Sequence, residues 1–507
     1  MNINTDRMKL TSMAYIRENR LNFQRRHFLR GASALSLASL LSACQKSAIP
    51  SIKTPRSKPN FLFLPIDDLN DWIGVLGTNA NVKTPHIDAL AGQGMLFTNA
   101  HAQAPICGPS RASLMSGLLP HQTGIYGQVR DEKLRGAINA VSSTKFLSEY
   151  LKHNGYYTVG RGKLFHKGAP DGSFHEYFRE GDFGPKPEKR MKWESNRTHT
   201  DWGPYPASDD DMLDFQTANW GADWLGKTHD DPFFLGLGMI RPHVPWHAPQ
   251  KWFDLYPLED IELPPWLETD MEDIPPAAIA LTHVPQMPTV EWAIEHDEWR
   301  PILQAYLASI SFVDHCIGIA VNALKASAYA DNTYIILFSD HGYHLGEKSR
   351  FAKMSLWDRS TRVPLIIAGP NIKPGKTEAP VGLIDLYPTI VDLAGLPENP
   401  ENAGQSLTPF LSGKSESRES VTSVYGKDNF AVIGERYRYI RYANGDEELY
   451  DLLNDPNEWT NIAGDPEYAD IKQQLAANIP TNTRPEITVK RQPSALEKSG
   501  SVATTGK

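Results

Sequence analysis

Two pairs of polar residues follow strongly apolar runs at matching places in the chain. Asp67 and Asp68 close one such run, and Asp340 and His341 close another. In an open parallel sheet, ligands bind outside the carboxyl ends of the strands, and carboxylates that converge there repel one another unless a cation joins them. A single pair would be explained by capping of the next helix. Two pairs favour a divalent metal site, and oxygen-rich ligands favour Ca²⁺ or Mg²⁺ over zinc.

The segment 105–117 reads Pro-Ile-Cys-Gly-Pro-Ser-Arg-Ala-Ser-Leu-Met-Ser-Gly. The pattern Cys-x-Pro-Ser-Arg, followed by Ala-Ser-Leu-Met-Ser-Gly, resembles the signature of the type I sulfatases, and the resemblance extends over residues 58–465. In that family the cysteine is oxidised to formylglycine by a formylglycine-generating enzyme that acts on the unfolded chain. The resemblance therefore implies that Cys107 becomes a formylglycine.

The resemblance also implies a mechanism. The aldehyde hydrates to a geminal diol, one oxygen attacks sulfur and releases the sugar alcohol, and collapse of the other hydroxyl to the aldehyde expels sulfate. A serine could perform only the first half. The implied cation is Ca²⁺, with Mg²⁺ the second choice, and its ligands would be Asp67, Asp68, Cys107, Asp340 and His341.

Further segments match the family one by one. Gly162-Lys163-Leu-Phe-His166 resembles the stretch that holds the formylglycine and the sulfate, and Arg241-Pro-His243 the stretch near the bridging oxygen. The segment 351–365 resembles the stretch whose lysine grips sulfate. A sulfuryl transition state carries negative charge, so a ring of cations would stabilise it. Alone, these residues would be explained as solvated lysines and structural histidines; with the cysteine motif, the implied catalytic set is Cys107, Arg111, Lys163, His166, His243 and Lys353.

The matching segments look most like the iduronate-2-sulfatase-like branch, which implies a sulfate ester on a sugar ring, possibly at O2 of a uronic acid. The expected substrates are oligosaccharides from a sulfated algal glycan or glycosaminoglycan. Two alternatives remain open: a phosphodiesterase or phosphonate hydrolase of the alkaline-phosphatase-like superfold, and an inactive surface glycan-binding lipoprotein.

Apolar runs alternate with amphipathic segments along the chain, which predicts an α/β fold with a large, mainly parallel sheet covered by helices. Expected strands are 59–66, 157–160, 232–240, 332–339 and 362–368, and expected helices are 84–91, 302–324 and 384–393. Short β-like stretches after residue 415 predict a smaller C-terminal α+β subdomain. The catalytic domain would therefore span 59–414 and the subdomain 415–479, followed by a polar, disordered tail over 480–507.

Two long segments, 167–231 and 250–300, are rich in Trp, Pro, Asp and Gly and show little periodicity. Loops of this length are usually functional, and we expect these insertions to line the substrate pocket. The chain has 507 residues, 22% charged, with a formal net charge of −9. This balance argues against nucleic-acid binding, which needs a basic face.

The N-terminus resembles an export signal. Arg25-Arg26 precede a short, mildly apolar run that ends in Leu-Ser-Ala-Cys44, a pattern similar to a twin-arginine signal with a lipobox. We therefore expect residues 1–44 to be a lipoprotein signal, 45–58 a tether, and the protein to be lipid-anchored in the periplasm or at the surface of a bacterial cell. Cys316, on the expected helix 302–324, should be a buried apolar residue, and no disulfide is expected.

Overall fold

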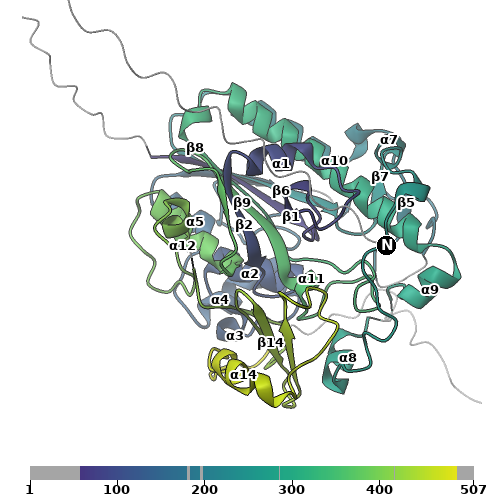
Figure 1. Cartoon of the computed structure of the whole chain (residues 1–507). Coiled ribbons are helices and arrows are strands. Elements are labelled where there is room, and N and C mark those ends of the chain that lie inside the picture. The colour runs from purple at the N-terminus through teal and green to yellow at the C-terminus, as the bar shows by residue number, and fades with distance from the viewer. Residues whose placement is uncertain (1–57, 180–182, 194–197, 285, 416, 488–507) are drawn as a thin grey trace, which may run out of the picture. The chain divides into compact units, whose positions relative to one another are not determined.

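The computed structural model describes residues 58–487 except 180–182, 194–197, 285 and 416. The expected signal and tether and most of the expected tail lie outside the described residues. Within them the chain forms a nine-stranded sheet in the order β10-β2-β9-β8-β1-β6-β3-β4, with β11 paired to β2 (Figure 1). The strands of this sheet are β1 (Asn60–Asp67), β2 (Gly94–His101), β3 (Tyr157–Gly162), β4 (Glu176–Phe178), β6 (Phe233–Pro242), β8 (Thr333–Ser339), β9 (Arg362–Ala368), β10 (Gly375–Thr377) and β11 (Val381–Gly382).

The predicted α/β fold with a mainly parallel sheet is confirmed. Strands β8, β1, β6, β3 and β4 run parallel, and β9 alone runs antiparallel to its neighbours β8 and β2. The central strand β1 is buried on both faces, as its continuous apolar sequence predicts. The five expected strands and three expected helices are present, with ends shifted by a few residues.

Helices cover both faces of the sheet. One face packs on α1 (Pro85–Ala91), α6 (Leu213–Leu225) and α10 (Trp299–Ala326), and the other on α2 (Cys107–Ser116), α5 (Leu147–His153) and α12 (Leu386–Leu393). The remaining helices are α3 (Pro120–Thr123), α4 (Asp131–Asn139), α7 (Gln250–Phe253), α8 (Pro276–Thr282), α9 (Val290–Glu295), α11 (Asp358–Thr361), α13 (Thr408–Leu411) and α14 (Ala469–Ala476). Short 3-10 turns are η1 (Gly74–Leu76), η2 (Asp209–Asp211), η3 (Leu258–Asp260), η4 (Ala330–Asn332), η5 (Leu383–Asp385) and η6 (Pro466–Tyr468).

Helix α10 is the one described helix that is long and apolar enough to cross a membrane by length and composition. However, 78% of its most apolar window is buried inside the structure, which is the pattern of a core helix. Cys316 lies on this helix and is fully buried, as expected for a small apolar side chain.

The C-terminal region forms a separate four-stranded antiparallel sheet, in the order β12-β13-β14-β15. These strands are β12 (Val421–Val424), β13 (Phe430–Ile433), β14 (Tyr437–Arg441) and β15 (Glu447–Asp451). Helix α14 packs on one face of this sheet, and Trp357 packs on the other. The expected α+β subdomain is therefore present.

Two expectations differ from the structure. The segment 167–231 was expected to have little periodicity, but it contains α6, which packs on β6 and on α10. It also contains the edge strand β4, and β5 (Trp202–Pro204) pairs with β7 (Trp246–Ala248) outside the main sheet. Trp, Asp and Gly within α6 hide its helical period. The polar tail was expected to be disordered from residue 480, yet the amides of Arg484 and Ile487 donate to the carbonyls of His121 and Gly124, each at 2.9 Å.

Candidate active site

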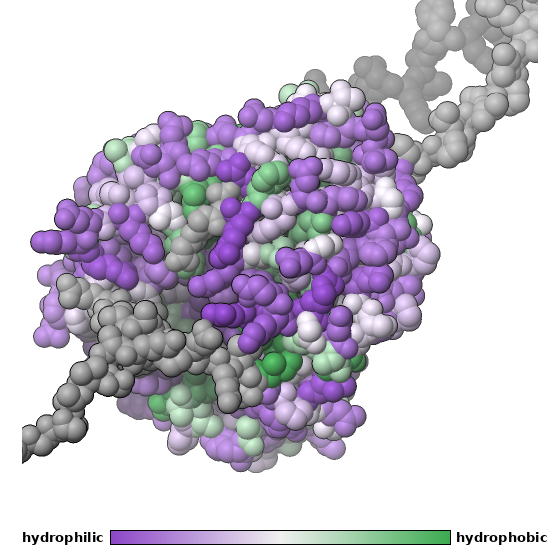
Figure 2. Space-filling view, turned by 180° about the vertical axis from the view of Figure 1, so that it is seen from behind, coloured by the Kyte–Doolittle hydropathy of each residue, from purple (hydrophilic) through white to green (hydrophobic). Residues whose placement is uncertain are grey.

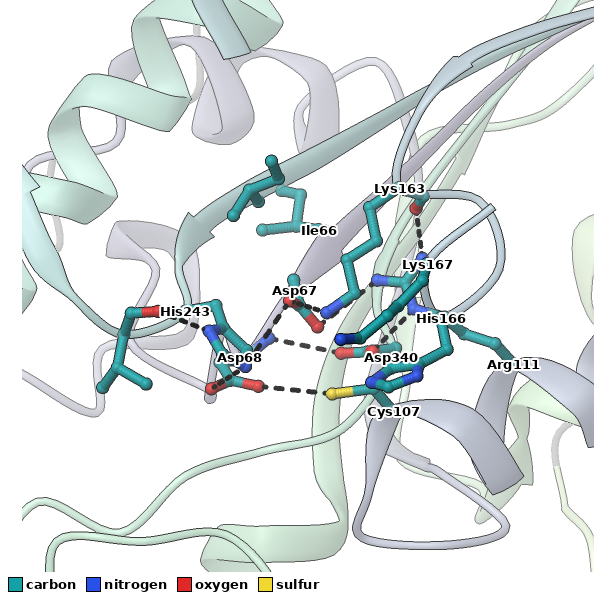
Figure 3. A network of polar contacts seen from close by, with 12 residues as sticks. Ile66, Asp67, Asp68, Cys107, Arg111, Lys163, His166, Lys167, His243 and Asp340 are labelled. Atoms are coloured by element: carbon teal, nitrogen blue, oxygen red, sulfur yellow. Dashed lines mark hydrogen bonds and ion pairs between the residues drawn. The ribbon is translucent and has the colours of Figure 1, made fainter. Parts of the chain in front are cut away.

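Four neighbouring parallel strands end at one place and deliver the predicted polar residues there. Strands β8, β1, β6 and β3 lead into Asp340, Asp67, His243 and Lys163. Ile66 pairs with Ser339, so Asp67 and Asp340 leave adjacent strands side by side. Figure 3 shows these side chains pointing toward one another beside Cys107. The strand ends thus bring together residues that are far apart in the sequence.

Cys107 is the first residue of α2, and its thiol faces the strand ends. Its Sγ lies 3.2 Å from His341 Nε2, 3.1 Å from Lys353 Nζ and 4.0 Å from Asp68 Oδ1. Burial, followed by the charge of Asp67, raises the pKa of the Cys107 thiol to about 12. Because the thiolate is the nucleophilic form, this direction of shift disfavours the unmodified thiol as a nucleophile.

Asp67, Asp68, Cys107 and His341 form one compact group of possible metal ligands. Their ligand atoms all lie within 4.8 Å of one another, and all four side chains are buried. Asp340 lies beside this group but is engaged elsewhere: its Oδ1 accepts from the amide of Asp68 at 3.2 Å and its Oδ2 from Arg111 Nε at 2.8 Å. The five predicted ligands are therefore neighbours, and four of them form the compact group.

The donor atoms of this group suit a hard divalent cation. Asp67 Oδ1 and Asp68 Oδ2 are buried and have no hydrogen-bond partner among the described residues, which is costly unless something else satisfies them. His341 Nδ1 lies 3.0 Å from the carbonyl of Gly342, and its Nε2 faces the group, 3.3 Å from Asp68 Oδ1. The two free carboxylate oxygens are the donors that favour Ca²⁺ or Mg²⁺.

Each of the three carboxylates forms an ion pair with one protein cation. Lys163 Nζ binds Asp67, Lys353 Nζ lies 2.5 Å from Asp68 Oδ1, and Arg111 pairs with Asp340. Burial acts to raise the pKa of Asp67, but the neighbouring cations, led by Lys163, hold it well below its usual range. Burial acts to lower the pKa of Lys353, but the charge of Asp68 raises it well above its usual range. Lys353 therefore remains an ammonium and can bind an anion.

The two predicted histidines are placed differently. His243 Nδ1 lies 2.6 Å from the carbonyl of Val244, and its Nε2 lies 3.8 Å from Asp68 Oδ2. Burial, followed by the charge of Lys353, lowers the pKa of His243 well below its usual range, so the imidazole is neutral with Nε2 facing the site. His166 is half-buried beside Lys163 (Figure 3), and its ring forms no hydrogen bond to the metal-ligand group within the described residues.

Sequence reasoning missed Tyr306, which fixes the backbone of Asp68. Asp68 has φ of 65°, a left-handed conformation that is unusual for an aspartate. The hydroxyl of Tyr306 donates to the carbonyl of Asp68 at 2.8 Å and accepts from the amide of Asn70 at 3.0 Å. The one available signal was a tyrosine in the apolar helix 302–324, because a buried hydroxyl needs a partner.

Two protein-family models match this chain. The family model described as Sulfatase matches residues 59–396, and the model described as N-sulphoglucosamine sulphohydrolase, C-terminal, matches residues 346–484. The chain belongs to the sulfatase family, and the resemblance noted in the sequence is confirmed. The protein is a sulfuric ester hydrolase.

The alignments with its relatives cover more than two thirds of each relative's length. A sulfatase of Formosa agariphila is 46% identical over 462 residues, covering 88% of this chain and 91% of the relative. The iduronate 2-sulfatase of Mus musculus is 32% identical over 399 residues, covering 67% of this chain and 69% of the relative. A solved 2-O GAG sulfatase superposes with a TM-score of 0.64 at 25% identity, covering 83% of this chain and 91% of that one. A phosphonate monoester hydrolase of Agrobacterium radiobacter shares the fold, with a TM-score of 0.65 at 24% identity, covering 83% and 94%.

Proposed function

We propose that this enzyme hydrolyses a sulfate ester on a carbohydrate, with a formylglycine derived from Cys107 as the nucleophile and Ca²⁺ as the resident cation. The observation that carries the proposal is the position of Cys107 Sγ, 3.2 Å from His341 Nε2 and 3.1 Å from Lys353 Nζ. A thiol that is disfavoured as a nucleophile, placed among metal-ligating and anion-binding groups, makes chemical sense as the precursor of a different nucleophile. Mg²⁺ is the second choice of cation.

Asp67, Asp68, Asp340 and His341, with the converted Cys107, would hold the cation. When bound, the cation would neutralise the carboxylates and act as a Lewis acid toward oxygen at the nucleophile and the sulfate. The formylglycine would supply a hydrated aldehyde, with one hydroxyl to attack sulfur and a second to allow elimination of sulfate. Both the cation and the hydrated aldehyde are compatible with the carboxylate oxygens of Asp67 and Asp68 that have no hydrogen-bond partner among the described residues.

The remaining residues bind and orient. Lys353 and Lys163 would hydrogen-bond the sulfate oxygens, where the transition state gathers negative charge. Arg111 holds Asp340 through Nε and reaches the carbonyl of Lys163, so it braces two of these groups at once. His243 presents an unprotonated Nε2 to the site, and can accept a hydrogen bond or a proton from a hydroxyl there. His166 would help to enclose the sulfate beside Lys163.

The proposed substrate class is an oligosaccharide from a sulfated algal glycan or glycosaminoglycan, with O2 of a uronic acid as the first ring position to examine. Similarity to an iduronate 2-sulfatase and to a 2-O GAG sulfatase supports this choice. We also propose that the enzyme is exported and lipid-anchored through Cys44, in the periplasm or at the cell surface. Membrane fractionation of the wild type and of Cys44→Ala tests the anchor, because the variant should lose membrane association.

Conversion of Cys107 would precede folding. The Cys107 side chain is 1% exposed and sits behind Lys353 and His341, so a modifying enzyme could not reach it in the folded chain. A formylglycine-generating enzyme acting on the unfolded chain fits this burial.

The experiment that tests the proposal combines mass spectrometry with an assay. The protein would be produced together with a formylglycine-generating enzyme, and the mass of the peptide containing Cys107 would be measured. We expect turnover of nitrophenyl sulfate and of at least one member of a panel of defined sulfated oligosaccharides, and much slower turnover of nitrophenyl phosphate and of a phosphonate ester. Cys107→Ala should be inactive, whereas Cys316→Ala, at the other buried thiol, should remain active. Faster cleavage of the phosphorus esters would favour the phosphonate-hydrolase alternative, and an unconverted, inactive protein the glycan-binding one.

A further inference from the structure

Phe183, which lies between β4 and β5, packs directly against the active site. Its ring stacks on the imidazole of His243 with a centroid distance of 4.6 Å and an interplanar angle of 12°. Lys163 Nζ lies 5.5 Å from the centre of the same ring. The side chain is 9% exposed, so an apolar ring forms a wall beside a strongly charged site.

Phe183 also links the site to a half-buried histidine. The ring of His199 lies 4.5 Å from that of Phe183, tilted by 45°, and His199 is partly exposed. Both rings come from the long segment that follows β3. The rings of His243, Phe183 and His199 therefore form a continuous row from beside the carboxylates toward the surface.

The position of Phe183 is fixed by Arg241, a buried residue near the end of β6. Arg241 Nη2 donates to the carbonyl of Phe183 at 3.2 Å, and its Nε and Nη1 donate to the carbonyls of His247 and His243 at 2.9 and 3.3 Å. One rigid guanidinium thus joins the segment that carries Phe183 to the loop that carries His243. These hydrogen bonds hold Phe183 in a defined position relative to His243.

The chemistry of Phe183 indicates what it contacts. A phenyl ring has no hydrogen-bond donor, so it cannot bind sulfate. The faces of the Phe183 ring are covered by His243 and His199, but its apolar edge can pack on the C–H groups of a sugar ring and keep water from the ester. We propose that Phe183 is a specificity-determining residue that contacts the sugar ring bearing the sulfate ester. This inference rests on the proposed sulfatase activity and names the wall that distinguishes a carbohydrate from a small aryl ester.

The test compares two substrates in the formylglycine-containing protein. The variants are Phe183→Ala and Phe183→Leu, with Phe178→Ala as the matched control because Phe178 is 40% exposed in the same part of the chain. For the best sulfated oligosaccharide of the panel, we expect kcat/KM to fall by roughly 10- to 100-fold in Phe183→Ala, mainly through KM, with a smaller loss in Phe183→Leu. For nitrophenyl sulfate the loss should be below about threefold, and Phe178→Ala should resemble the wild type with both substrates.

Equal losses with both substrates would overturn the inference, because Phe183 would then act only by orienting His243, and the sulfatase assignment would stand. Unchanged kinetics with both substrates would also overturn it. A converted wild-type protein that cleaves neither sulfate ester would overturn the proposed function itself, and this inference with it. Circular dichroism and the unfolding midpoint identify a variant that does not fold, and in that case Phe183→Leu carries the comparison.

Discussion

The charged residues around Cys107 and those around Arg438 are buried to the same degree but are partnered differently. At the active site, Asp67 Oδ1 lies 3.5 Å from Arg111 Nη2, and Asp68 Oδ2 lies 3.8 Å from His243 Nε2. These separations are too long for hydrogen bonds. Two carboxylate oxygens in this cluster are thus left for a ligand.

Around Arg438, beneath the C-terminal sheet, the ion pairs are shorter, although Arg438 Nε and Glu458 Oε1 face each other without forming a hydrogen bond. Its Nη1 donates to Leu356 O and Thr361 Oγ1 at 2.8 and 3.0 Å, its Nη2 binds Asp358 Oδ1 at 2.6 Å, and its Nε lies 2.9 Å from Glu458 Oε1. Nearby, Lys348 Nζ lies 2.6 Å from Asp270 Oδ1. This second cluster joins the catalytic region to the C-terminal sheet.

This difference in partners indicates that the Cys107 cluster serves ligand binding and the Arg438 cluster serves stability. Burying a charge is costly unless it is paired and hydrogen-bonded. The ion pairs of the Arg438 cluster, at 2.6 and 2.9 Å, link the catalytic region to the C-terminal sheet, so we assign this cluster to stability. The Cys107 cluster contains the candidate metal ligands, and its carboxylate oxygens without a hydrogen-bond partner are left for a cation and a substrate. Substitutions in the two clusters should accordingly affect different measurements.

The largest effect is expected at Asp68. Asp68→Ala should abolish sulfatase activity, by at least about a thousandfold, and weaken Ca²⁺ binding, because a ligand and part of the negative charge are lost. Calorimetric titration with Ca²⁺ and steady-state assays measure both quantities. Asp270→Asn is the control from the other cluster and should lower stability while leaving Ca²⁺ affinity unchanged. Full activity of Asp68→Ala after exhaustive chelation would contradict the metal site.

The second effect is on stability. Arg438→Met removes the cation shared by the buried carboxylates of Asp358 and Glu458. We expect the free energy of unfolding to fall by about 3–5 kcal/mol, measured by denaturant titration. A loss below about 1 kcal/mol, the range of an exposed ion pair, would show that the second cluster is not a structural joint.

The third effect is a pH dependence in the second cluster. Burial raises the pKa of Glu458 to about 7, although the Arg438 charge opposes this and Asp358 reinforces it. A carboxyl whose pKa is higher in the folded state stabilises the protein below its unfolded pKa, and this contribution is lost as the pH rises through about 7. Between pH 5 and 7, wild-type stability should therefore fall relative to Glu458→Gln, by up to about 1.4 kcal/mol per pH unit. Parallel stability curves for the two proteins would contradict this prediction.

The smallest effect is expected at Tyr306. Tyr306→Phe removes the hydroxyl that holds the Asp68 carbonyl and should weaken Ca²⁺ affinity by roughly tenfold, the equivalent of about one buried hydrogen bond. Tyr156→Phe is the matched control, because the buried Tyr156 hydroxyl has no hydrogen-bond partner among the described residues. A purely structural role would lower the unfolding midpoint of Tyr306→Phe without changing the Ca²⁺ dissociation constant.

The sequence predicted the residues at strand ends well, because their placement follows from local signals. A continuous apolar run followed by Asp67-Asp68 or Asp340-His341 is readable in a short window, and parallel strands place such ends at one edge. The fold class and the C-terminal sheet were predictable for the same reason. Helix α6 was missed because Trp, Asp and Gly interrupt its apolar pattern.

The residues that could not be predicted act across long separations. Tyr306 reaches Asp68 over 238 positions in the chain, and nothing near either residue indicates the contact. Phe183 lies in the irregular stretch between β4 and β5, and Arg241, which holds its place beside His243, donates to its carbonyl. The Arg438 cluster was likewise invisible, because its partners come from the loop after β8 and from the C-terminal region.

The most direct test of the central claim uses Cys107→Ser. A serine keeps one hydroxyl that can attack the sulfate ester but lacks the second hydroxyl needed to eliminate sulfate. Intact-mass spectrometry before and after incubation with nitrophenyl sulfate should show one covalently bound sulfuryl group on the substituted residue, with no steady-state turnover. Multiple turnovers at near the wild-type rate would contradict the formylglycine mechanism and the role assigned to Cys107.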